Sequence, residues 1–314
     1  MKTKIIEPKF KSRLGLAGQL FSRVACVGAV ILICSSGSAQ NLFVSGTDAR
    51  GGEIFKFTWD AKQSVYASGL YRPSDFTFDT AGNLFVMDYE ILDAGGDAAI
   101  YRITPDGMLT IFASTLSYLS NLVADKAGNL FAADYDSGSI YKYKPTGLRA
   151  NFASGLYHPA GMAFDSNGNL FVVDNSAGNL YQGSIYQYKP DGSRVTFAVL
   201  DPSDRPGGLA FDSVGNLFMA DLGGNIYKYN LSGVLRRQGR TTFGSVPESA
   251  QSLAFDSAGN LLVVDAGDVS GSSAAKPNAI YRFTQQGVRS TFASGSALGE
   301  TFSHLAVQPI PCCQ

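Results

Sequence analysis

The sequence predicts an all-β fold, a ring of six four-stranded antiparallel blades that forms a β-propeller. Three observations lead to this prediction. A strand–turn–strand motif recurs at intervals of 40 to 47 residues, a second two-stranded motif follows each copy, and an incomplete unit stands near each end of the chain. Repeats of this length, rich in Phe, Tyr, Val, Ile and turn residues, are typical of propellers.

The first motif predicts two strands joined by a tight turn. Clear copies are "GMAFDSNGNLFVVD" from Gly161 and "GLAFDSVGNLFMAD" from Gly208. An asparagine precedes the second strand of every copy: Asn41, Asn83, Asn129, Asn169, Asn216 and Asn260. Five copies carry Asp-x-x-Gly between the strands. Asp favours the first position of a type I turn, and Gly accepts the left-handed backbone at its end.

The second motif supplies a third and a fourth strand. It reads "IYRITPDG" from Ile100 and "IYQYKPDG" from Ile185, and closing strands such as "TIFAS" and "STFAS" follow. Four short strands in a row form one meander, which cannot bury both of its faces alone. Six meanders packed around an axis do bury them, because each sheet covers the next.

The two incomplete units complete each other. "NLFVSG", from Asn41, opens three strands of a blade that lacks its first strand, and "SHLAVQ", from Ser303, aligns with the first strands of the other copies. We therefore expect blade 1 to combine residues 41–70 with 302–310. Blades 2 to 6 are expected at approximately 71–116, 117–156, 157–204, 205–247 and 248–298.

The first 39 residues have the layout of a secretory signal peptide. Six basic residues and one acidic residue lead to the apolar run Val24 to Cys34, and small residues follow up to Ala39. We expect cleavage after Ala39, a mature domain of residues 40–314 and a secreted or periplasmic monomer. Retention of the leader as an anchor is the alternative.

Charge and cysteine content narrow the classes of partner. Without the leader, 19 basic and 25 acidic residues remain, so the net charge of the domain is about −6. It has no basic patch, which argues against nucleic acid and anionic membranes. Its two cysteines, Cys312 and Cys313, are adjacent, and a disulfide between neighbours is strained. Packing and strand pairing must therefore stabilise the fold.

The repeated "GNLFVVD…GSIYQYKPDG" pattern resembles NHL-repeat propellers and the wider superfamily of gluconolactonase and regucalcin. The resemblance covers nearly all of the domain. It implies a six-bladed fold, and it leaves activity open, since the superfamily includes lactonases, lyases, sensor domains and scaffolds. Its lactonases hold a divalent cation at the channel mouth. The matching positions here are Ala160 and Gly207, whose side chains cannot coordinate a metal.

One position later, the six inner strands carry a set of residues expected at the channel mouth. They are Asp75, Asn121, Gly161, Gly208, Ser252 and His304. If the protein is a lactonase-like hydrolase or a lyase, Asp75, Asn121 and His304 are the candidate catalytic residues. His304 is suited to general-base chemistry.

The main hypothesis is a binding or scaffold module that uses one face of the ring. Long loops between the second and third strands alternate with short ones, and insertions of this kind tend to mark a binding face. The expected partner is a small molecule, a glycan, a peptide or an envelope protein. The candidate ligand-binding residues are Tyr71, Arg72, Tyr89, Glu90, Tyr135, Tyr157, His158 and Asn175.

No organic cofactor is expected, and one loop raises the question of calcium. "DYEILDAGGD" carries four carboxylates, Asp88, Glu90, Asp93 and Asp97. Hard cations such as Ca²⁺ prefer several oxygen ligands, and a solvated acidic loop explains the same pattern. An aspartate ends the second strand in five blades, and this regularity favours a structural role for it.

Overall fold

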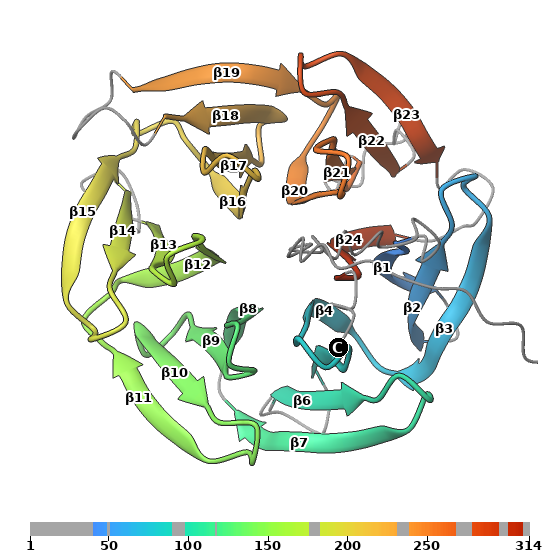
Figure 1. The fold of residues 1–314 in the computed structure, drawn as a ribbon, viewed down its shortest axis with the longest axis vertical. Helices are drawn as coiled ribbons and strands as arrows, with labels where there is room; N and C mark the ends of the chain where they lie inside the picture. The colour runs from blue at the N-terminus through green and yellow to red at the C-terminus, as the bar shows by residue number, and fades with distance from the viewer. Residues whose placement is uncertain are drawn as a thin grey trace, which may run out of the picture. The chain divides into compact units, whose positions relative to one another are not determined.

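A computed structural model describes residues 40–48, 51–89, 98–116, 118–175, 183–230, 239–267, 278–294 and 301–309. These residues form six four-stranded antiparallel sheets and no helix. The sheets stand as blades around a common axis (Figure 1), which confirms the predicted six-bladed propeller. Within the described ranges, no helix is long and apolar enough to cross a membrane. The expected signal peptide, residues 1–39, lies outside them.

Each blade runs from an inner strand beside the axis to an outer strand at the rim (Figure 1). Blades 1 and 2 contain β24 (Thr301–Val307), β1 (Leu42–Asp48), β2 (Gly51–Phe57) and β3 (Gln63–Leu70), then β4 (Pro73–Phe78), β5 (Leu84–Tyr89), β6 (Ala98–Ile103) and β7 (Leu109–Leu116). Blades 3 and 4 contain β8 (Leu119–Ala124), β9 (Leu130–Asp134), β10 (Ser139–Tyr143) and β11 (Arg149–Ala153), then β12 (His158–Phe164), β13 (Leu170–Asn175), β14 (Ser184–Tyr188) and β15 (Arg194–Val199). Blades 5 and 6 contain β16 (Pro206–Phe211), β17 (Leu217–Asp221), β18 (Asn225–Tyr229) and β19 (Arg240–Ser245), then β20 (Ala250–Phe255), β21 (Leu261–Asp265), β22 (Ala279–Phe283) and β23 (Arg289–Ser294).

The C-terminal strand closes the ring, as the incomplete end units predict. Strand β24 pairs antiparallel with β1, and Val44 lies opposite Leu305 while Leu42 lies opposite Val307. Blade 1 therefore combines strands from both ends of the domain. The side-chain amide of Asn41 also donates to Gln308 Oε1 at 3.0 Å, which extends the junction by one bond.

The Asp-x-x-Gly turns form as the sequence predicts. In blade 2, the Gly82 N–H donates to the Asp79 carbonyl at 3.1 Å, and Gly82 has a positive φ of 81°. The Asp79 carboxylate accepts the Ala81 N–H at 2.9 Å and the Asn83 side-chain amide at 2.7 Å. The recurrent asparagine therefore pairs with the turn aspartate.

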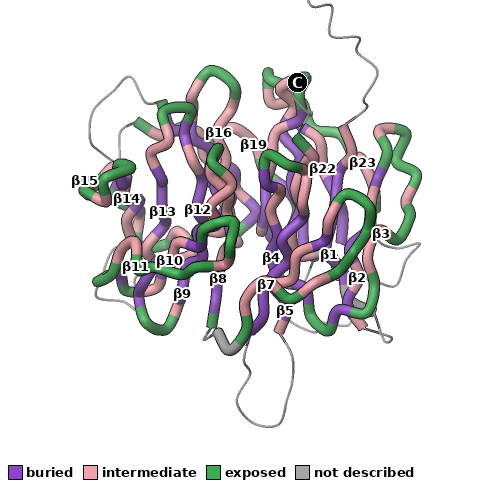
Figure 2. Tube along the Cα trace, turned by 60° about the horizontal axis from the view of Figure 1, so that its bottom comes forward, coloured by how far each residue is buried: buried purple, intermediate pink, exposed green. Residues whose placement is uncertain are grey.

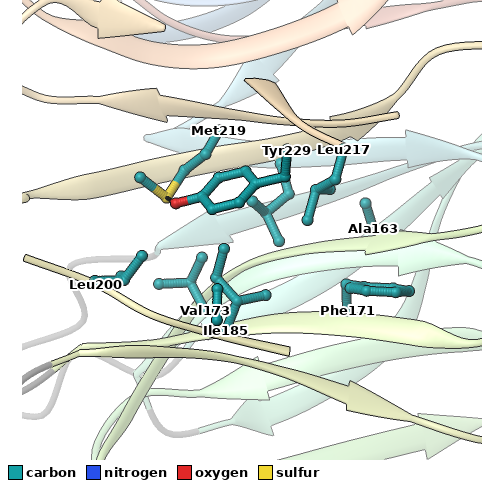
Figure 3. Packing of buried hydrophobic residues seen from close by; sticks show 10 residues of the cluster. Ala163, Phe171, Val173, Ile185, Leu200, Leu217, Met219 and Tyr229 are labelled. Carbon is teal, nitrogen blue, oxygen red and sulfur yellow. Dashed lines mark hydrogen bonds between the residues drawn. The ribbon is translucent and has the colours of Figure 1, made fainter. Parts of the chain in front are cut away.

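The hydrophobic core lies in the six gaps between neighbouring blades. Between blades 4 and 5, Phe171, Val173 and Ile185 pack against Leu217, Met219 and Tyr229 (Figure 3). Second strands are almost wholly buried, whereas fourth strands are largely exposed (Figure 2). Burial of apolar faces between sheets stabilises the ring without disulfides.

Candidate functional site

A cavity of about 500 Å³ lies at the centre of the ring, and all six inner strands line it. We call it the central cavity. The corresponding residue of each inner strand borders it: Asp75, Asn121, Gly161, Gly208, Ser252 and His304. The structure thus brings the three candidate catalytic residues, Asp75, Asn121 and His304, to one cavity.

Three of these side chains bond across the gaps between inner strands. Asp75 Oδ2 accepts the Asn121 side-chain amide and the Leu122 N–H, both at 2.7 Å. Asn121 Oδ1 accepts the Met162 N–H at 2.9 Å. Ser252 Oγ accepts the Leu305 N–H at 3.3 Å. Inner strands belong to different sheets, so these side chains satisfy backbone donors that no ladder reaches.

Glycine replaces the bridging side chains on the other side of the cavity. A Cβ on Gly161 would lie 2.2 Å from the Gly207 carbonyl oxygen, and one on Gly207 would lie 2.8 Å from the Gln251 carbonyl oxygen. Backbones of blades 4, 5 and 6 therefore pack directly on one another. This half of the wall offers no side-chain oxygen at Gly161, Gly207 or Gly208 for a metal.

Burial shifts the pKa values of Asp75 and His304, the two titratable groups that line the central cavity, in opposite directions. Desolvation raises the pKa of Asp75 to about 7, and hydrogen bonds from Leu122 and Phe76 oppose part of that rise. Desolvation lowers the pKa of His304 to about 4. His304 Nδ1 is buried and has no hydrogen-bond partner among the described residues. His304 is therefore a neutral imidazole at pH 7, and Asp75 titrates near neutrality.

A second candidate site lies where the chain enters the inner strands, which we call the loop face. Five rings from blades 2, 3 and 4 are in continuous contact there. They are Tyr89, Tyr118, Tyr135, His158 and Tyr157, and we call them the aromatic cluster. Tyr118 lies 5.5 Å from Tyr89 and 5.6 Å from Tyr135, between ring centroids. His158 stacks on Tyr135 at 4.0 Å and meets Tyr157 edge-on at 4.4 Å.

Backbone and carboxylate bonds hold the aromatic cluster in place. The Tyr157 and His158 N–H groups donate to Asp174 Oδ1 at 2.8 and 2.9 Å. The Tyr135 N–H donates to the Tyr118 carbonyl at 2.8 Å, and His158 Nδ1 lies 3.1 Å from the Tyr135 carbonyl oxygen. The Tyr89 hydroxyl donates to the Leu119 carbonyl, and burial raises the pKa of that hydroxyl.

The structure brings four of the eight candidate ligand-binding residues into this cluster: Tyr89, Tyr135, Tyr157 and His158. Tyr71 and Arg72 are exposed at the start of blade 2. Asn175 borders a separate cavity of about 250 Å³ together with Tyr135 and Arg205. Glu90 lies outside the described residues.

Sequence reasoning missed Tyr118, the ring at the centre of the cluster. The signal for it is alignment, because Tyr118 precedes Asn121 by the same three positions that separate Arg72 from Asp75 and His158 from Gly161. No local motif marks it, since "LSYLSNL" lacks the Gly-Leu-Tyr sequence found before blades 2 and 4.

The aspartate that ends the second strand has a structural role in several blades. Asp88 Oδ2 accepts the Tyr71 N–H at 2.8 Å, and Oδ1 accepts the Arg72 N–H at 2.6 Å. Asp265 bonds the Glu248 and Ser249 N–H groups in the same way. The chain is thereby fixed as it enters the inner strand.

The structure does not test the calcium hypothesis. Of its four carboxylates only Asp88 is described, while Glu90, Asp93 and Asp97 lie outside the described residues. Within the described ranges, no three or more His, Cys, Asp or Glu side chains come together as a metal-binding group.

Comparisons with known proteins identify the fold. No family model and no curated protein matches the sequence. Among solved structures, a Bacteroides caccae protein of unknown function matches with 14% identity and a TM-score of 0.61, over 86% of this chain and 99% of that one. A Xanthomonas campestris gluconolactonase matches with 18% identity and a TM-score of 0.59, over 76% and 83%.

A third match is a catalytically inactive virginiamycin B lyase from Staphylococcus aureus, in complex with quinupristin. It has 14% identity and a TM-score of 0.58, over 87% of this chain and 94% of that one. At these identities the similarity concerns the fold, and activity does not transfer with it. The NHL-repeat label stays a prediction. The chain is a six-bladed β-propeller that resembles the gluconolactonase and virginiamycin B lyase structures.

Proposed function

We propose that this protein is an exported, monomeric binding module that recognises a glycan through the aromatic cluster. The observation that supports the proposal is the exposure of two rings at its surface. Tyr118 and Tyr157 are each 53% exposed, although both contact buried or half-buried neighbours. Exposed rings that are fixed in position offer contact area at a small cost in conformational entropy.

The chemistry of the cluster favours a sugar over a purely apolar ligand. A tyrosine presents an apolar ring and a polar hydroxyl at its tip. A pyranose offers the complementary pair, with C–H groups on its faces and hydroxyls at its edges. Polar groups for those hydroxyls stand beside the rings, since Asn175 and Arg205 line the 250 Å³ cavity that Tyr135 borders. Sites of this kind combine aromatic contact area with a few polar groups.

A glycan array compares the wild type with a Tyr118→Ala/Tyr157→Ala variant. We expect the wild type to bind at least one class of oligosaccharide and the variant to lose that binding. Ile111→Ala serves as the control, because Ile111 is 64% exposed on the outer strand β7 and lies outside the cluster. Absence of glycan binding by the wild type, or equal binding by the wild type and the Tyr118→Ala/Tyr157→Ala variant, would contradict the proposal.

A second candidate function is a lactonase-like hydrolase or a lyase acting in the central cavity. Asp75 favours it, because a buried carboxyl group that titrates near pH 7 suits acid–base catalysis. The hydrogen bonds that Asp75 accepts oppose the enzymatic function, because those from Asn121 and Leu122 engage its carboxylate in joining two blades and Phe76 occupies the other oxygen. The enzymatic function is supported if the wild type hydrolyses δ-gluconolactone and a folded Asp75→Asn variant does not. Equal rates for the wild type and this variant would exclude Asp75 from catalysis.

A further inference from the structure

A groove separates blades 3 and 4 at the end of the ring opposite the loop face, beside the Asp-x-x-Gly turns. Its volume is about 580 Å³. The floor consists of three phenylalanines, since Phe131 lies 5.0 Å from Phe152 and 5.1 Å from Phe164, both edge-on. Phe152 and Phe164 are half-buried, so the groove exposes aromatic surface.

The repeat supplies an internal comparison, because the groove between blades 5 and 6 has the same design. Its three phenylalanines are Phe218, Phe243 and Phe255, with the same edge-on contacts at 5.0 Å. That groove has a volume of only about 170 Å³. Two grooves of equal architecture therefore differ in size more than threefold.

The two grooves differ in the side chain at one turn position that lines both of them. In blade 6, Gln285 donates to the Ala258 carbonyl at 3.0 Å, and its Nε2 lies 2.6 Å from the site of a Cβ on Gly259. In blade 4, the corresponding turn residue is Pro190, and no atom lies within 4 Å of the Cβ site on Gly168. The glutamine fills its groove, and the proline leaves the other one open.

The open groove also carries two cations where the filled one has a single lysine. Lys142 lies over the Phe131 ring at 5.1 Å, as Lys228 lies over Phe218 at 5.3 Å. Lys126 has no counterpart, since Ser213 takes its place in blade 5. Its Nζ donates to the Ser166 carbonyl at 2.8 Å, so the ammonium spans the two blades at the rim of the groove.

The acidic residues of the groove are already engaged. Asp125 Oδ1 accepts the Ala127 and Asn129 N–H groups, and Asp165 accepts the Asn167 and Asn169 N–H groups, at 2.8 to 2.9 Å. These carboxylates are fixed in their turns. Lys126 has one carbonyl partner and Lys142 lies 3.9 Å from Asp125, so both ammonium groups retain free donors toward an anion.

We propose that this groove binds a small aromatic anion. The ring of the ligand packs on Phe131, Phe152 and Phe164, and its carboxylate or sulfonate lies between the ammonium groups of Lys126 and Lys142. Aromatic rings bind to one another edge-on or offset, and a charged hydrogen bond adds to that contact. The site is independent of the aromatic cluster, because it lies at the other end of the ring.

Two fluorescent probes that differ by one charge test the site. 8-Anilinonaphthalene-1-sulfonate carries a sulfonate, and N-phenyl-1-naphthylamine is the same scaffold without it. We expect the wild type to bind the sulfonate at one saturable site. Pro190→Gln, which introduces the residue that blade 6 carries at Gln285, should weaken binding of both probes. Lys126→Ala/Lys142→Ala should weaken only the sulfonate, by about tenfold.

Lys228→Ala is the matched control, because it removes the corresponding lysine from the filled groove, and it should leave both affinities unchanged. Amide chemical-shift changes in the wild type, confined to residues 124–127 and 165–168, would support the site without any variant. The proposal is overturned if Pro190→Gln binds the sulfonate like the wild type, if the double variant weakens both probes equally, or if no saturable site is found. The proposal is also overturned if the wild type is a dimer and Pro190→Gln dissociates it, because a second copy of the chain would then occupy the groove.

Discussion

Leu305 is the residue through which the closure of the ring is best tested. It is 5% exposed and belongs to a core cluster with Leu42 and Val44 of blade 1 and Leu262 and Val264 of blade 6. Strand β24 thus packs its side chain between the first and the last blade. Leu305→Ala removes that contact and leaves the backbone pairing with β1 in place.

The expected cost follows from the position of the side chain. A buried Leu→Ala substitution costs roughly 2–5 kcal/mol, and the cost is smallest where the surroundings relax into the space. Leu305 also borders the central cavity, so we expect a value near the lower end, about 2–3 kcal/mol. For a domain of this size the change lowers the Tm by about 4–12 °C.

Thermal and urea unfolding of residues 40–314 measure this change. Leu148→Ala is the control, since Leu148 is 63% exposed in a turn and its loss should change stability by less than about 0.5 kcal/mol. The reasoning is refuted if Leu305→Ala lowers the Tm no more than Leu148→Ala does. A changed urea m-value would show instead that the substitution alters the compactness of the folded or unfolded state or breaks two-state unfolding.

Three further predictions concern the ring, its titratable groups and calcium. Deleting Phe302 to Gln308 should abolish cooperative unfolding by circular dichroism, because β1 loses one of its two partner strands and the ring opens. Deleting the last four residues should change the Tm little. Cooperative unfolding of the longer deletion would disprove ring closure. His304 has a folded pKa near 4, below its unfolded value of 6.5, so its contribution to the free energy of unfolding is present above pH 6.5 and is lost as pH falls toward 4. Asp75 has a folded pKa near 7, above its unfolded value of 3.8, so its contribution to the free energy of unfolding is lost as pH rises from about 4 through 7. Urea titrations across this range should show a smaller acid-side loss in His304→Gln and a smaller loss toward pH 7 in Asp75→Asn, and unchanged profiles would contradict these pKa shifts. If the acidic loop that begins at Asp88 binds calcium, millimolar Ca²⁺ should raise the Tm, and an unchanged Tm would exclude the site.

Repetition made the architecture predictable from the sequence. The Asp-x-x-Gly turns and the alternating aromatic strands are local features, and each recurs in register with the others. Asp79 and Gly82 adopt the turn that their residue types favour. The similarity of "SHLAVQ" to the inner strands was enough to predict the pairing of β24 with β1. Blade 1 lacks an inner strand, and β24 is an inner strand without a blade, so the two are expected to pair.

The roles of the site residues were less predictable. Asp75 and Asn121 were identified as candidate channel residues, yet the sequence does not show that they bond to each other across two blades. That bond depends on how closely the inner strands of blades 2 and 3 approach each other, which is a tertiary contact between repeats. Tyr118 could not be predicted because its neighbours in the cluster, Tyr89 at the end of β5 and Tyr135 after β9, are far from one another in sequence.

The sequence by itself determined the fold class, the number of blades and the way the ring closes, because these follow from turn chemistry and strand periodicity within each repeat. Tertiary structure alone decided which surfaces are distinctive. The aromatic cluster and the open groove at Pro190 both arise where neighbouring blades meet. A repeat specifies its own strands, but the contacts between repeats depend on residues about 40 positions apart that no local pattern connects.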